Sequence, residues 1–354
     1  DVYKRQKCTI QNIADHLGLS RNTVSKALKN SSEVSENTRN LVIKTASKLG
    51  YKNATFATPV IPASKTDSNG TILFLTRTYA SDSEFWTTVL RGIESILSNA
   101  NYHLAISIMS DSDLKQLNFP QTISDSSIKG IILVEICDKV VCDALSQFNL
   151  PIVSVDMPNV PFEELNGIDV VTMESKKNLK KIINQLIEKG AESFGFVGDL
   201  YSPNVSRGFQ ERYNALSECL AEHQLPLNQK NCLLHQTPED FRNFQTTVNN
   251  LQAMISLPDV FICGNDWTAI QLIYALQFLG FQIPKDICVV GFDNIPAASR
   301  ISPSLTTIST PQKYLGIAAA RQILERIQHP NCPHVFCQYE TELIIRNSTN
   351  IISF

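Results

Sequence analysis

Apolar residues at the start of the chain recur every three or four positions, which is the period of an α-helix. The first such stripe consists of Ile10, Ile13, Ala14 and Leu17. Thr9 can cap the start of this helix, and Gly18 can take the left-handed conformation that ends it. Ser20 and Ser35 can cap two further helices. The predicted buried positions of these helices are Val24, Ala27 and Leu28 in the second and Leu41, Val42, Thr45, Ala46 and Leu49 in the third.

After residue 70 the pattern changes to short continuous apolar runs that alternate with amphipathic segments. The predicted strands are 72–75, 104–108, 130–136, 151–156, 193–198, 259–263 and 287–292, and the predicted helices are 85–97, 139–148, 175–189, 206–222 and 266–279. Strands that are apolar throughout are typical of parallel sheets covered by helices on both faces. The sequence therefore predicts an α/β protein with an all-α helix-turn-helix head and a two-lobed body of parallel, Rossmann-like sheets.

Charge is distributed unevenly between these two parts. Residues 1–53 contain ten basic and four acidic residues, a net charge of +6, whereas the remaining residues contain 21 basic and 30 acidic residues, a net charge of −9. A small basic head on an acidic body is the electrostatic pattern expected of a phosphate-binding head. An ordinary solvated charged face is the alternative that charge alone leaves open.

Composition excludes several other classes of protein. With 354 residues and 43% hydrophobic residues, the chain can bury a sizeable core, which excludes global disorder. No apolar run is long enough to span a membrane, and the first residues lack the apolar segment of a secretory signal. The nine cysteines are scattered and lie mostly in apolar runs, as buried free thiols do in a reducing compartment. We therefore expect a cytoplasmic protein.

Motifs for catalysis, cofactors and metals are weak. The sequence has no Gly-x-Ser-x-Gly elbow, no Walker-A loop and no Gly-x-Gly-x-x-Gly fingerprint, so we predict neither an enzyme nor a cofactor. His329, Cys332, His334 and Cys337 have a spacing that could hold a soft metal ion. A surface crossover loop explains the same residues equally well, and we predict no metal.

The second predicted helix directs polar side chains away from its buried stripe. These side chains are Arg21, Asn22, Ser25, Lys26 and Lys29. Arginine can pair with guanine, asparagine with adenine, and lysine with guanine or phosphate, so this face is suited to the DNA major groove. A three-helix module that binds another protein through a polar face is the alternative.

Residues 9–28, followed by Asn30, residues 34–39 and residues 49–51, resemble the N-terminal signature of the lactose-repressor (LacI/GalR) family of bacterial transcription regulators. The resemblance implies that Arg21, Asn22 and Lys26 read bases. It also places several residues at positions that contact phosphates or cap helices. These are Thr9, Ser20, Thr23, Ser25 and Asn30. From the polar face of the second helix, we also expect Lys29 to contact the DNA backbone.

The segment after Tyr51 departs from the family pattern. In the family a hinge helix forms there on DNA, and a leucine inserts into the minor groove and kinks the duplex. Here Asn53 replaces the usual proline, and Val60 occupies the leucine position directly after Pro59. Because Pro59 disfavours helix at the residue before it, we expect a short or absent hinge helix, with Val60 or Phe56 as a weaker wedge.

Polar residues end three of the predicted body strands, at Asp156, at Asn265 with Asp266, and at Asp293. Ligands of open parallel sheets sit beyond these strand ends, although any one such residue is more often a helix cap or turn residue. The body also resembles the periplasmic-binding-protein-like (type I) effector domain of the family. That resemblance implies effector contacts from Asp156, Arg212, Asn265 and Asp293, with aromatic contacts from Phe85, Trp86 and Trp267. Phe85 also falls on the core stripe of its helix.

These observations predict three segments: a head at 1–53, a hinge at 54–69 and an effector-binding and dimerisation domain at 70–354. We expect the lobes to comprise approximately 70–170 with 297–330, and 171–296 with 331–349. The predicted function is that of a homodimeric, nucleoid-associated repressor that binds a pseudo-palindromic operator. A small polar effector, such as a sugar or sugar derivative, would bind between the lobes and alter operator affinity, by induction or by corepression.

Two rival functions use the same body. A sugar-binding transport receptor would share it, but such a receptor needs a secretory signal and has no basic head. A regulator that senses a partner protein would keep the head. Arg212, Asn265 and Asp293 favour a polar small molecule over a partner protein, since they combine charged and amide groups suited to hydroxyls.

Overall fold

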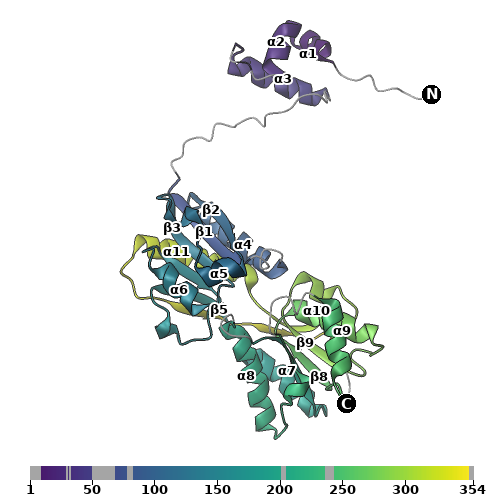
Figure 1. Ribbon diagram of the computed structural model, residues 1–354. Helices are drawn as coiled ribbons and strands as arrows, with labels where there is room; N and C mark the ends of the chain where they lie inside the picture. Colours follow the sequence, from purple (N-terminus) through teal and green to yellow (C-terminus); the bar gives the residue numbers. More distant parts are fainter. Residues whose placement is uncertain are drawn as a thin grey trace, which may run out of the picture. The chain divides into compact units, whose positions relative to one another are not determined.

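A computed structural model of the chain describes residues 9–28, 31, 33–49, 68–77, 83–200, 205–235 and 243–350. The chain divides into two compact units, Asp1–Asp67 and Ser68–Phe354 (Figure 1). The predicted division of the first unit into a head and a hinge stays a prediction, because residues 50–67 lie outside the described part of the chain.

The first unit contains α1 (Ile10–Leu17), α2 (Arg21–Leu28) and α3 (Glu36–Lys48). The Thr9 hydroxyl accepts the backbone N–H of Asn12 at the start of α1, and Gly18 ends the helix with a φ of 64°. The hydroxyls of Ser20 and Ser35 accept backbone N–H groups at the starts of α2 and α3. The core of this unit contains Ile13, Ala14, Val24, Ala27, Val34, Val42 and Ala46.

Two leucines predicted to be buried in α3 are instead at the surface. Leu41 is 51% exposed and Leu49 is 36% exposed. The buried stripe of α3 consists of Val42, Thr45 and Ala46, at the helical spacing i, i+3 and i+4. Leu41 lies one position before this stripe and is therefore rotated away from the core.

The second unit is built on two six-stranded sheets, one in each lobe (Figure 1). The first sheet has the order β11-β5-β4-β3-β1-β2 and is parallel throughout. Its strands are β1 (Gly70–Arg77), β2 (Tyr102–Met109), β3 (Ile128–Val134), β4 (Ile152–Val155), β5 (Ile168–Met173) and β11 (Phe336–Tyr339).

In the second sheet, of order β12-β10-β9-β8-β6-β7, β12 is antiparallel to β10 and the other pairs are parallel. Its strands are β6 (Phe194–Asp199), β7 (Leu233–His235), β8 (Val260–Cys263), β9 (Cys288–Asp293), β10 (Thr306–Ser309) and β12 (Glu342–Ile344).

Helices connect the strands and cover the sheets. They are α4 (Glu84–Leu97), α5 (Asp111–Gln116), α6 (Lys139–Ser146), α7 (Lys177–Glu188), α8 (Arg207–Glu222), α9 (Phe244–Ala253), α10 (Asp266–Phe278) and α11 (Gln312–Gln328). Short 3₁₀ turns are η2 (Gln121–Ser124), η3 (Phe162–Glu164), η4 (Gln229–Asn231), η6 (Pro296–Ser299) and η7 (Asn347–Thr349). Helices α4 and α11 pack backbone against backbone, since a Cβ atom on Gly316 would lie 2.0 Å from the carbonyl oxygen of Val89. The alternation of strands and helices confirms the predicted α/β class.

The predicted lobe boundaries are wrong in the last third of the chain. Strand β10, expected in the first lobe, belongs to the second sheet, and β11, expected in the second lobe, belongs to the first sheet. The chain therefore passes between the lobes after β5, between β10 and β11, and between β11 and β12. Local hydrophobic patterns identify strands but do not state which sheet a short strand joins.

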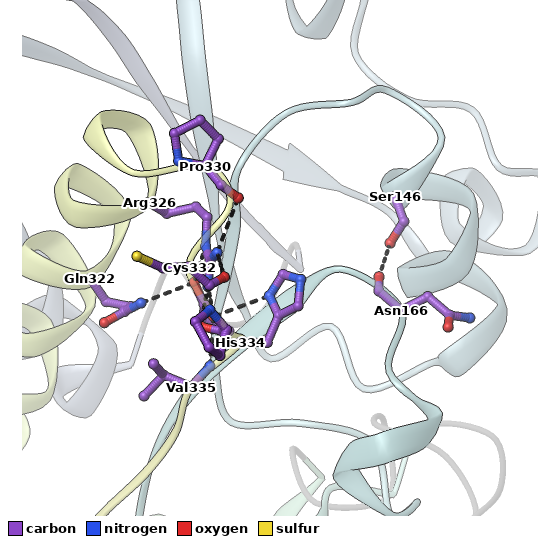
Figure 2. Close-up of polar contacts among 10 residues, drawn as sticks. Ser146, Asn166, Gln322, Arg326, Pro330, Cys332, His334 and Val335 are labelled. Atoms are coloured by element: carbon purple, nitrogen blue, oxygen red, sulfur yellow. Dashed lines mark hydrogen bonds and ion pairs between the residues drawn. The ribbon is translucent and has the colours of Figure 1, made fainter.

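A buried carboxylate ties the last part of the first lobe together (Figure 2). Asp169 in β5 is fully buried, and its Oδ1 and Oδ2 accept hydrogen bonds from Nη2 and Nε of Arg326 at 2.8 and 3.0 Å. The carboxylate also accepts from the side chain of Gln322 and from the backbone N–H of Val335, and it lies 3.2 Å from Nδ1 of His334. This network fixes the segment between α11 and β11.

The same segment contains the residues with metal-like spacing. His334 contacts Asp169, and the carbonyl of Cys332 accepts a hydrogen bond from Arg326 (Figure 2). Cys337 lies within β11. Within the described ranges, no group of three or more His, Cys, Asp or Glu side chains is arranged to hold a metal ion. The segment connects α11 to β11.

Candidate functional site

Helix α2 presents one polar face to solvent. Val24 and Ala27 are buried, which directs Arg21, Asn22 and Lys26 outward, and all three are exposed. Thr23 and Ser25 are half-buried beside them. The structure therefore places the three predicted base-reading residues together on the surface of one helix, as a major-groove reader requires.

Two of the predicted phosphate contacts have a structural role. Thr9 and Ser20 cap α1 and α2, and the Ser20 hydroxyl lies 2.8 Å from the hydroxyl of Thr23. Lys29, Asn30, Phe56 and Val60 lie outside the described residues, so their predicted roles stay predictions.

In the body, three charged residues predicted to bind an effector interact electrostatically and are called the Arg212 cluster; Arg212 and Asp156 are buried, and Asp293 is half-buried. Arg212, on α8, is 3% exposed, Asp156 follows β4, and Asp293 ends β9. Burial lowers the pKa of Arg212, whereas the charges of Asp293 and Asp156 oppose that change. The guanidinium lies 3.6 Å from the centre of the Phe292 ring, and its Nη1 donates to the carbonyl of Gly264 at 2.6 Å. The three residues are far apart in the sequence. Asp156 and Asp293 were named because they end predicted strands, and Arg212 was named through the family resemblance.

Asp156 belongs to the contact between the lobes. Its backbone is left-handed, with a φ of 81°, and its Oδ1 accepts the backbone N–H of Met157 at 2.8 Å. The next residues reach the start of α8: the carbonyl of Met157 accepts the N–H of Arg207 at 2.9 Å, and Pro158 forms an isolated β-bridge with Ser206. A ligand that bonds to Asp156 or Arg212 would therefore act on residues that join the two lobes.

The other predicted effector residues are placed differently. Asn265 caps α10 by accepting the N–H of Thr268 at 2.9 Å, which is the structural role such a residue often has. Phe85 and Trp86 are 5% and 8% exposed, and their rings make an edge-to-face contact within the hydrophobic core. Trp267, at 42%, is the exposed aromatic of the three. These positions favour packing or capping roles for Asn265, Phe85 and Trp86.

Asp266, beside Asn265, is a buried structural carboxylate. It is 0% exposed and accepts hydrogen bonds from the hydroxyl of Thr307 and the N–H of Ile295, at 2.5 and 2.9 Å. Burial raises its pKa to about 7, and burial likewise raises the pKa of Asp156 to about 6. Burial also raises the pKa of Asp293.

We expect these raised pKa values to make the body more stable as the pH falls from about 7.5 to 5.5. A carboxyl whose folded pKa exceeds its unfolded value of about 3.9 stabilises the fold when protonated, and this contribution is lost as pH rises through the folded pKa. Thermal unfolding of the wild type across this range measures the effect. Asp266→Asn should flatten the profile, whereas the exposed control Glu340→Gln should leave it unchanged. A melting temperature that falls steadily from pH 7.5 to 5.5 would contradict the expectation.

Comparison with known proteins supplies an independent view of both units. The profile described as "Bacterial regulatory proteins, lacI family" matches residues 9–53, and that of the "Periplasmic binding protein-like domain" matches residues 183–349. The HTH-type transcriptional repressor PurR of Photobacterium profundum is 26% identical over 345 residues, which cover 96% of this chain and 98% of that protein. The ribose operon repressor of Haemophilus influenzae is 27% identical over 344 residues, with the same coverage.

Solved structures share the fold. A complex of the transcriptional regulator CelR with cellobiose has a TM-score of 0.68 and 19% identity, and it covers 97% of this chain and 100% of that chain. The Lac repressor dimer bound to operator and the anti-inducer ONPF has a TM-score of 0.66 and 20% identity, covering 97% and 99%. A LacI-family regulator of Enterococcus faecium with bound ribose has a TM-score of 0.64 and 25% identity, covering 79% and 98%.

No helix among the described residues has the length and apolar character needed to cross a membrane. The two relatives described above are named as repressors. The two profiles match in the order that the sequence predicted, and the relatives align over nearly the whole chain. The protein is a member of the lactose-repressor (LacI/GalR) family of bacterial transcription regulators.

Proposed function

We propose that this protein is a repressor that binds a pseudo-palindromic DNA operator as a homodimer. A small polar effector that binds to its body lowers or raises its affinity for the operator. The observation that carries the proposal is the outward face of α2, where Arg21, Asn22 and Lys26 are exposed together opposite a buried stripe. Relatives that align over nearly the whole chain are named as repressors, and the Lac repressor that shares the fold is a dimer on its operator.

The first step is the reading of DNA by α2. Arg21 and Lys26 supply donors for the O6 and N7 of guanine, and Asn22 supplies the amide pair that suits adenine. A single small head buries too little surface for strong specific binding, so two heads on one dimer read two half-sites. A protein with this task works at the nucleoid, in the cytoplasm.

The second step is control by the body. The Arg212 cluster combines one guanidinium with two carboxyl groups, which together donate to and accept from the hydroxyls of a sugar or sugar derivative. Structural neighbours were solved with cellobiose and with ribose. Because Asp156 lies where the loop after β4 meets α8, effector binding would change how the lobes close and alter operator affinity, either by induction or by corepression.

We expect Arg21→Ala to lower operator discrimination by about 5- to 150-fold, because one bidentate base contact contributes about 1–3 kcal/mol. Lys29→Ala, which removes a predicted phosphate contact, should weaken binding to operator and random duplex alike and reduce the salt dependence by about one unit. Operators are first selected from random duplexes with the wild-type chain. The affinities of each variant for the operator and for random DNA are then compared at several salt concentrations. If the wild type selects no dyad-symmetric sequence, the proposed function is wrong; equal behaviour of the two variants would reject the assigned roles.

A further inference from the structure

Lys26, one of the predicted base-reading residues, is held by an acidic side chain. Its Nζ forms an ion pair with Oε2 of Glu33, which lies seven residues later between α2 and α3. Both side chains face solvent, with Lys26 48% and Glu33 66% exposed. The DNA-facing side of the head therefore carries a carboxylate directly against one of its own donors.

Ser31 and Val34, which flank Glu33 in the chain, are hydrogen-bonded to the neighbouring helices. The N–H of Ser31 donates to the carbonyl of Lys26 at 3.0 Å, which attaches the segment to the end of α2. From α3, Nη2 of Arg39 donates to the carbonyls of Ser31 and Val34 at 2.7 and 3.2 Å. Val34 is buried in the core of the head. Glu33 thus projects from an anchored turn and not from a free loop.

This anchoring changes what the lysine can do. A free lysine ammonium is a mobile point charge on a flexible stem, and any nearby phosphate can attract it. The Glu33 carboxylate competes for the ammonium and repels a phosphate that approaches it. The ammonium has three N–H donors, so it can keep its contact with Glu33 while it donates to an uncharged acceptor on a base.

We propose that Glu33 is a specificity-determining residue, which restrains Lys26 so that its ammonium contacts a base edge in preference to the DNA backbone. This inference rests on the proposed operator-binding function and deepens it. Glu33 offsets one positive charge on the reading face, which lowers affinity for all DNA. Glu33 lowers the affinity less for a DNA sequence that places a base acceptor within reach of the restrained ammonium. The ratio of operator affinity to random-DNA affinity therefore rises.

The test compares four forms of the full-length chain: wild type, Glu33→Gln, Glu33→Asp and Asp15→Asn. Asp15→Asn is a matched control, since Asp15 is an exposed acid on α1 whose Oδ1 accepts from Gln11, and its loss changes the charge of the head by the same amount. Each form is titrated with operators selected by the wild type and with random duplexes of equal length. The salt concentration runs from about 50 to 200 mM, where phosphate contacts make affinity strongly salt-dependent. Thermal unfolding of each variant is measured in parallel.

We expect Glu33→Gln to bind random duplex about 3- to 10-fold more tightly and to increase the salt dependence by about one phosphate contact. Its ratio of operator to random affinity should fall by about 5- to 10-fold, with relaxed base preference at one position of each half-site. Glu33→Asp should restore part of the ratio, and Asp15→Asn should change it by less than about twofold. In a Lys26→Ala background, Glu33→Gln should no longer change the base preference, because Glu33 acts through Lys26.

Other outcomes overturn the inference. If Glu33→Gln and Asp15→Asn show the same ratio and the same salt dependence, Glu33 contributes only net charge. If Glu33→Gln weakens binding to both duplexes and lowers the melting temperature of the head, Glu33 is structural. If the wild type itself selects no dyad-symmetric operator, the proposed function is wrong and the inference fails with it. If the wild type selects an operator that Glu33→Gln reads equally well, only the inference is wrong.

Discussion

Replacing Asp169 by Asn is expected to lower the free energy of unfolding of the body by about 3–5 kcal/mol, the usual cost of removing one partner from a buried ion pair. The substitution would leave the guanidinium of Arg326, which is 6% exposed, without a countercharge inside the first lobe. Because asparagine keeps only one acceptor oxygen, the substitution would also remove the acceptor of either Gln322 or the N–H of Val335. Urea unfolding followed by circular dichroism measures the change.

A matched control is available on the surface. The ion pair between Lys177 and Glu340 is 67% and 71% exposed, so Lys177→Ala should change stability by less than about 1 kcal/mol. Burial raises the pKa of Asp169, but hydrogen bonds from Arg326, Val335 and Gln322 outweigh it, and the pKa lies below its ordinary value. The stabilisation by Asp169 is therefore present above about pH 4 and is lost as the pH falls through the folded pKa. An Asp169→Asn variant as stable as Lys177→Ala at pH 7 would refute this account.

Replacing Arg212 by Met is expected to weaken effector binding by at least about 100-fold, a loss typical of charge-assisted hydrogen bonds in a buried site. Methionine keeps much of the side-chain volume against Phe292 and Phe209, so the change removes chiefly the donors. The measurement is a thermal-shift screen of full-length protein against pentoses, hexoses, disaccharides and nucleosides. A compound that shifts the wild type should not shift the variant.

A second arginine serves as the control. Arg207, also on α8, donates from Nε to Glu211 at 2.9 Å and lies 5.4 Å from the centre of the Phe336 ring, outside the Arg212 cluster. Arg207→Met should keep the effector response. Operator binding without effector should be retained by both variants. An effector response that survives in Arg212→Met would remove this residue from the proposed site.

Much of the head could be predicted from the sequence because its structure depends on short-range signals. Thr9, Gly18 and Ser20 mark helix ends through their own side chains or backbone freedom, and the stripe with Val24 and Ala27 decides which face is buried. Glu33 was counted as one acid among four in the head. Its role depends on where a turn brings it relative to Lys26, and a one-dimensional pattern does not contain that distance.

The body was predictable in its class but not in its connections. Strands β1, β3 and β9 were identified because nearly all of their residues are apolar and buried. The short strands β10 and β11 were placed in the wrong lobes, because each has only four residues and its local pattern does not say which sheet it joins. Asp169 lay unremarked inside an apolar run, since only the folded chain brings Arg326 to it.

The late strands have a consequence for synthesis on the ribosome. The head consists of contiguous residues and can fold as soon as it leaves the exit tunnel, whereas the first sheet lacks β11 and the second lacks β12 until almost the entire polypeptide has been translated. For most of its production the nascent molecule therefore has a folded reader without a finished control unit. Fragments released early by a premature stop codon would keep the head but lose both its regulation and the body that we expect to pair two heads.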